Sequence, residues 1–80
     1  MNFQVGQRGV FAESGYSAKA TLEKMQEELN GKTEGTAYYF RLHTPMPGLP
    51  AGRLLRVWAT SDKRWQHYKG WSFYPRQEQP

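Results

Sequence analysis

The chain of 80 residues contains no cysteine, which excludes disulfide bonds and thiolate metal ligands. It also lacks any apolar run approaching the ~18 residues of a membrane span, and its N-terminus shows no basic segment followed by a long apolar stretch. These absences favour an untargeted cytoplasmic protein without membrane contact. A chain of this length predicts one small domain, whose core must be stable through packing alone.

Acidic residues are scarce in the second half of the chain. Residues 36–80 contain seven Lys and Arg residues and only two acids, Asp62 and Glu78, which gives a formal charge of +5. Residues 1–35 contain four Lys and Arg residues and five acids, which gives −1. The basic half also holds all three tryptophans and nine of the twelve aromatic residues. This polarity indicates that a partner contacts the second half and is bound rather than chemically transformed.

Residues 17–29 have the periodicity of an amphipathic helix. The apolar positions are spaced by four, three and four residues, and they are Ala18, Leu22, Met25 and Leu29. Ser17 can cap the first turn, and Asn30-Gly31 tolerates the left-handed backbone that ends a helix. We therefore predict one helix here, with its charged side in solvent.

Aromatic and β-branched residues predict strands on both sides of this helix. One strand precedes it, in either residues 3–5 or residues 8–12, and three follow, in residues 37–43, 54–60 and 65–74. The predicted fold is a single α+β domain of residues 1–75, with the order β-α-β-β-β. One helix packs on a three- to four-stranded antiparallel sheet, and residues 76–80 form a disordered tail.

Alternation along these strands separates an apolar side from a basic, aromatic side. Tyr38, Phe40 and Leu42 face the core in the first of the three, and Leu55, Val57 and Ala59 do so in the second. A turn at Ser61-Asp62 would pair Trp58 with Trp65 and Arg56 with His67. A bulge at Gly70 would then return Trp71 and Phe73 to the core.

The opposite side of the predicted sheet combines rings with cations. Its candidate binding residues are Tyr39, Arg41, His43, Arg56, Trp58, Arg64, Trp65, His67 and Lys69. Bases can stack on such rings while the cations neutralise phosphates, so the favoured partner is a nucleic acid. The alternative is a phage- or plasmid-type accessory protein that docks on an acidic surface of a host protein, as inhibitor or adaptor, because Trp, Tyr and Arg are also enriched at protein interfaces. A homodimer through the sheet edge or the rings is compatible with the same pattern.

The proline-rich loop of residues 44–52 carries two apolar residues, Met46 and Leu49. They could insert into a groove of a protein partner, or they could fold back and cap the core.

Catalytic motifs are missing from the chain. His43 and His67 lack the further ligands of a zinc site, and no nucleophile elbow, P-loop or dinucleotide-binding turn occurs. We therefore predict a non-enzymatic protein without metal or cofactor. One catalytic alternative is a metal-free ribonuclease that uses the two histidines with Arg41, Arg56 and Lys69.

Overall fold

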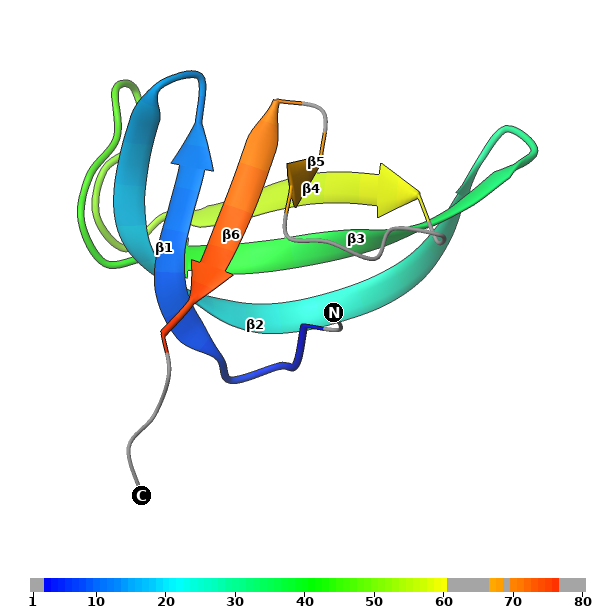
Figure 1. Cartoon of the computed structure of the whole chain (residues 1–80), viewed down its shortest axis with the longest axis horizontal. Coiled ribbons are helices and arrows are strands. Elements are labelled where there is room, and N and C mark those ends of the chain that lie inside the picture. The colour runs from blue at the N-terminus through cyan, green and yellow to red at the C-terminus, as the bar shows by residue number, and fades with distance from the viewer. Residues whose placement is uncertain (1–2, 61–66, 69, 77–80) are drawn as a thin grey trace.

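A computed structural model describes residues 3–60, 67–68 and 70–76, which form one antiparallel sheet of six strands (Figure 1). The strands are β1 (Arg8–Glu13), β2 (Tyr16–Asn30), β3 (Thr33–Leu42), β4 (Leu54–Thr60), β5 (His67–Tyr68) and β6 (Trp71–Pro75). Their order across the sheet is β4-β3-β2-β1-β6-β5. The described residues contain no helix, so the predicted α+β fold with the order β-α-β-β-β is wrong and the fold is all-β.

The largest correction concerns residues 17–29, which belong to β2. Residues at a spacing of two are buried in its first half, namely Ala18, Ala20 and Leu22. A register shift between Leu22 and Lys24 marks a β-bulge, which returns Met25 to the inner face although it lies three residues after Leu22. Leu29, predicted to lie in the core, is 71% exposed. The spacing of apolar residues that predicted a helix is therefore also the spacing of a strand with a bulge. Pairing with β1 and β3 overrides the local preference of this segment for a helix.

Two tight turns connect the first three strands. Glu13 pairs with Tyr16, and the two residues between them have positive φ, 53° at Ser14 and 83° at Gly15. Such a pair of left-handed residues matches the right-handed twist of a hairpin. Asn30 pairs with Thr33, and Gly31 between them has φ 67°. The left-handed backbone predicted to end a helix thus forms a hairpin turn.

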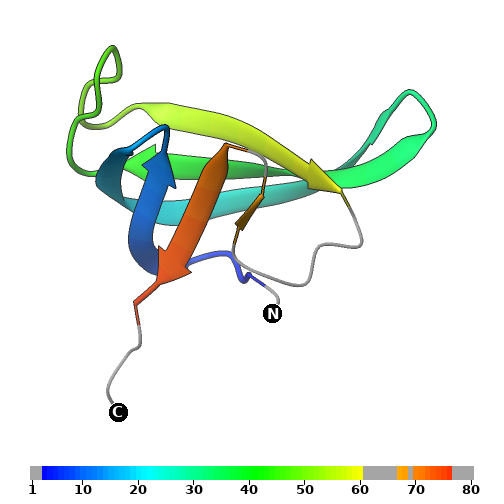
Figure 2. The same cartoon turned by 45° about the horizontal axis from the view of Figure 1, so that its top comes forward.

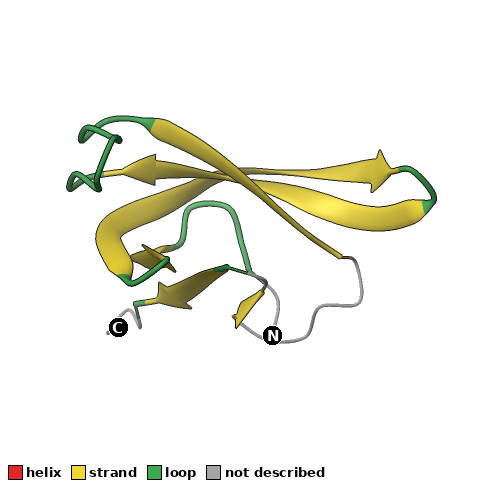
Figure 3. Cartoon of the chain, turned by 90° about the horizontal axis from the view of Figure 1, so that it is seen from above, coloured by secondary structure: helices red, strands yellow, loops and turns green. Residues whose placement is uncertain are grey.

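The sheet curls into two layers (Figures 2 and 3). The 15-residue strand β2 is long enough to take part in both, because its first half pairs with β1 and its second half with β3. Strands β1 and β6 run across the direction of β3 and β4 (Figure 1). The outer end of the β2–β3 hairpin projects away from the layers (Figure 1).

The core lies between these layers and is largely aromatic. Its fully buried large side chains are Phe11, Phe40, Phe73, Leu22 and Leu42. Phe3 precedes the first strand but is buried, with its ring centroid 5.5 Å from those of both Tyr38 and Phe73. Of the two candidate N-terminal segments, residues 8–13 therefore form the strand, while Phe3 supplies a ring to the core.

The later strands match the predictions in part. Strand β4 has the predicted bounds, and Tyr38, Phe40 and Leu42 on β3 are buried as predicted. The predicted pairing of Arg56 with His67 is wrong, because their strands β4 and β5 lie at opposite ends of the sheet order; Arg56 pairs with Tyr39 and His67 with Ser72. Trp71 and Phe73 are buried as predicted, but Gly70, with φ 81°, lies in a turn before β6 rather than in a bulge.

Candidate functional site

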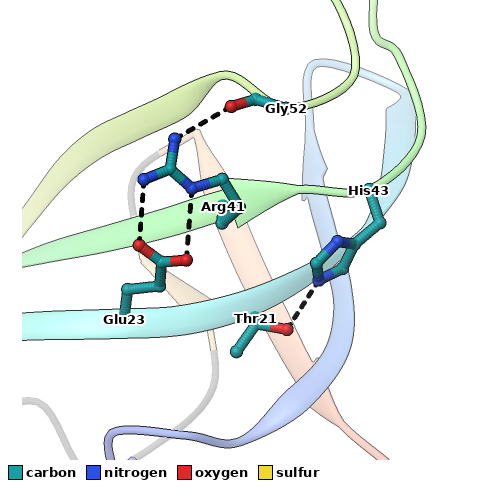
Figure 4. Close-up of polar contacts among 5 residues, drawn as sticks. All are labelled: Thr21, Glu23, Arg41, His43 and Gly52. Carbon is teal, nitrogen blue, oxygen red and sulfur yellow. Dashed lines mark hydrogen bonds and ion pairs between the residues drawn. The ribbon is translucent and has the colours of Figure 1, made fainter.

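The outer face of β3 and β4 brings four of the predicted binding residues together. Tyr39 and Arg41 alternate with the buried residues of β3, and Arg56 and Trp58 alternate with the inward residues of β4. Tyr39 lies directly opposite Arg56 in the ladder. His43 follows the end of β3, and its ring Nε2 lies 2.6 Å from the hydroxyl of Thr21 on β2 (Figure 4).

Arg41 is held by an acid from β2. Its Nε and one terminal nitrogen donate to the two carboxylate oxygens of Glu23, each at 3.1 Å, and its other terminal nitrogen donates to the carbonyl of Gly52 at 2.9 Å (Figure 4). The Arg41 hydrogen bonds lower the pKa of Glu23, and the positive charge of Arg41 adds to this effect. The charge of Arg41 is thus balanced within the protein.

Arg56 is engaged in the same way. It forms an ion pair with Glu28 of β2, and its pKa is raised by hydrogen bonding to Tyr39 first and to Glu28 second. The ammonium of Lys24 lies 5.3 Å from the centroid of the Tyr39 ring. The acids and the lysine come from the segment predicted to be a solvated helix side, and they share the face that was predicted to be basic.

Trp58 packs against its own sheet. A Cβ atom at Gly35 on β3 would collide with the Trp58 indole, so the ring lies directly against that glycine. Ala37, opposite Trp58 in the ladder, is fully buried although its position faces outward. The indole Nε1 is buried and has no hydrogen-bond partner among the described residues. The Trp58 ring therefore packs over the outer face of the sheet and does not present an open surface on which a base could stack.

The remaining predicted site residues fall into those outside the described structure and those of the loop. Arg64, Trp65 and Lys69 lie outside the described residues, and His67 is described only through its backbone in β5. Met46 is buried in the core and Leu49 packs against it, joined by two backbone hydrogen bonds of 2.8 Å. Both loop residues thus cap the core, the second of the two alternatives that the sequence allowed.

A hollow on the outer face of β1, β2 and β6 has a different electrostatic character. Its volume is about 790 Å³, and ten residues line it: Gly6, Arg8, Gly9, Val10, Lys19, Ala20, Thr21, His43, Tyr74 and Arg76. We refer to this set as the basic hollow. Its described lining contains three permanent cations and a histidine, and no acid is among these described residues. Arg8 and Lys19 form no ion pair with any described residue.

The side chains of the basic hollow lie in two adjacent rows across the strands. In the first row Tyr74 lies opposite Val10, Val10 lies opposite Lys19, and the backbone of His43 bonds to that of Lys19 at 2.7 Å. This ring row is Tyr74, Val10, Lys19 and His43. In the second row the Arg76 amide donates to the Arg8 carbonyl at 2.7 Å, and Arg8 lies opposite Thr21. This arginine row is Arg76, Arg8 and Thr21.

Only His43 of this hollow was among the predicted site residues. Alternation in residues 8–11 could have separated outward Arg8 and Val10 from inward Phe11, but Lys19 had been assigned to a helix. Tyr74 and Arg76 are brought to β1 by a pairing over more than 60 residues of chain, as in Val10 with Tyr74. No local spacing in the sequence signals such a cluster.

Comparison with models of known protein families, with curated proteins and with solved structures found no match. Within the described parts of the chain, no helix could cross a membrane. No group of three side chains suited to metal binding occurs in the same parts.

Proposed function

We propose that the protein is a non-catalytic module that binds nucleic acid through the basic hollow. The observation that supports this function is the grouping of Arg8, Lys19 and Arg76 around one hollow whose described lining contains no acid. Clustered cations release counterions when they neutralise phosphates, and this release dominates sequence-independent binding. We also propose that the protein is cytoplasmic and that it uses no cofactor.

The proposed interface differs from the face predicted from the sequence. Arg41 and Arg56 are already paired with Glu23 and Glu28, so a phosphate would have to compete with a carboxylate for each of them. Arg8 and Lys19 face no such competition from the described residues. The basic hollow is therefore the better phosphate site.

Docking on an acidic protein surface is supported less well. That hypothesis drew on the Trp, Tyr and Arg side chains of the sheet face and on Met46 and Leu49 as displayed apolar contacts, and Met46 is only 8% exposed. The ribonuclease alternative stays a prediction, because the side chain of His67 is outside the described structure.

A titration of a fluorescently labelled oligonucleotide tests the proposal. Binding should weaken between about 50 and 200 mM salt, with a log–log slope of about −2 for three phosphate contacts on a single strand. Arg8→Ala should flatten this slope by about 0.7, because it removes one contact.

Arg56→Ala is the matched control, since it removes the same charge from a cation that is paired with Glu28. It should leave the slope unchanged. Absence of binding at low salt would refute nucleic-acid binding. Equal slopes for Arg8→Ala and wild type would place the contacts outside the basic hollow.

A further inference from the structure

We infer that the nucleic acid bound in the basic hollow is single-stranded and that one of its bases stacks on Tyr74; this inference rests on the proposed function. Among the described lining residues of the hollow, Tyr74 is the one with a large aromatic ring, and it is 42% exposed. Val10, its direct neighbour in the ring row, is 39% exposed and extends the apolar surface. A phenol ring with an apolar neighbour offers a base a stacking surface.

The two rows match the two parts of a single strand. Arg8 and Val10 are two residues apart on β1, so the rows are separated by about 7 Å along the strands. A base on Tyr74 and a phosphate at Arg8 or Arg76 could then belong to the same or the next nucleotide. The ring row crosses four adjacent chain segments. The three spacings between them give the row a length of about 14 Å. A short extended strand fits along it.

A duplex fits this surface poorly. Its bases are stacked and paired, so no base face is open to Tyr74 unless the helix is disrupted. Reading a groove requires an element that projects from the protein. One element that projects is the end of the β2–β3 hairpin (Figure 1). It carries Glu27 and Glu34, which form no ion pair with the described residues and repel phosphates, whereas Glu28 is already paired with Arg56.

The test compares single-stranded and duplex oligonucleotides of one sequence with wild type, Tyr74→Leu and Tyr74→Phe. Single strands should bind wild type more tightly than the duplex does. Tyr74→Leu should weaken single-strand binding about 5- to 150-fold, the equivalent of ~1–3 kcal/mol for one stacked base. Tyr74→Phe keeps the ring and should stay within about twofold of wild type. Thermal unfolding of each variant verifies that the fold is intact.

The outcomes separate this inference from the proposed function. Tight duplex binding that is insensitive to Tyr74→Leu would overturn the single-strand inference and leave nucleic-acid binding in place. Failure of every oligonucleotide to bind would overturn both. DNA and RNA single strands are tested side by side. Binding of either strand more tightly than the duplex supports the inference, and a preference for RNA over DNA would assign a contact to the 2′-hydroxyl.

Discussion

The indole nitrogen of Trp71 donates a hydrogen bond to the backbone carbonyl oxygen of Trp58, with 3.2 Å between the two atoms. These residues lie on β6 and β4, which are separated by three strands in the sheet order. The contact therefore joins two parts of the curled sheet that are distant in the strand order. Trp71 is 5% exposed and contacts four core rings, those of Phe3, Phe11, Tyr38 and Phe40.

Trp71→Phe should lower the free energy of unfolding by roughly 1–3 kcal/mol, because it removes the donor and leaves a smaller ring in a packed site. Urea unfolding followed by far-UV circular dichroism measures this change. Tyr16→Phe, at a ring that is 55% exposed, is the control and should stay within about 0.5 kcal/mol of wild type. Equal stability of all three proteins would show that the Trp71 contact is not structural.

Gly35→Ala should destabilise the fold by about 1–3 kcal/mol, because the added methyl group would meet the Trp58 ring and the Ala59 carbonyl. The indole would have to move, so the tryptophan emission spectrum should change as well. Thr33→Ala, an exposed position on the same strand, is the comparison and should alter neither property. An unchanged spectrum in the Gly35 variant would contradict the contact between Gly35 and Trp58.

Glu23→Gln should reduce the dependence of stability on acid pH. The pKa of Glu23 is lowered in the folded state, so its stabilising contribution is complete above the ordinary pKa of 4.5 and is lost as the pH falls through the lower folded value. The glutamine variant lacks this contribution and should show a flatter acid limb in stability-versus-pH curves. Glu34→Gln is the control, because Glu34 forms no ion pair with the described residues. Identical acid limbs for Glu23→Gln and wild type would argue against the Arg41 pair.

Met46→Ala distinguishes a core residue from a displayed one. Because Met46 is buried, its truncation should cost about 2–4 kcal/mol of unfolding free energy, measured by urea titration. A residue held out for a partner would lose nothing measurable in the isolated protein. Pro47→Ala, at an exposed position of the same loop, controls for changes in the loop backbone.

Strands β3 and β4 could be predicted because their pattern is consistent with only one local structure, whereas the single strand predicted over residues 65–74 is replaced by the two short paired strands β5 and β6. Tyr38, Phe40 and Leu42 alternate with polar neighbours, and no helical spacing competes with this period. The segment with Ala18 and Met25 was mispredicted because a bulge after Leu22 makes a strand look helical at that spacing. Its many Glu and Lys residues strengthened the wrong choice, since both are good helix formers.

The candidate site was harder to predict than the strands. The outward direction of Tyr39 and Arg41 followed from alternation, but their partners Lys24 and Glu23 come from β2 and depend on which strands are neighbours. The basic hollow depends still more on topology, because Arg8 and Tyr74 meet only after β1 and β6 pair. Charge counted along the chain could show an excess of cations without showing which of them the protein itself neutralises.

The sequence of β2 has a consequence for aggregation. If β3 detached from β2, the freed segment would not remain a ready-made template for intermolecular strand addition, because its own preference is helical. We expect a synthetic peptide of residues 16–30 to gain helicity in trifluoroethanol and to form no amyloid fibres that bind thioflavin. Fibre growth from that peptide would disprove this protection. A long strand built from helix-forming residues would thus reduce intermolecular strand pairing when the protein is partly opened.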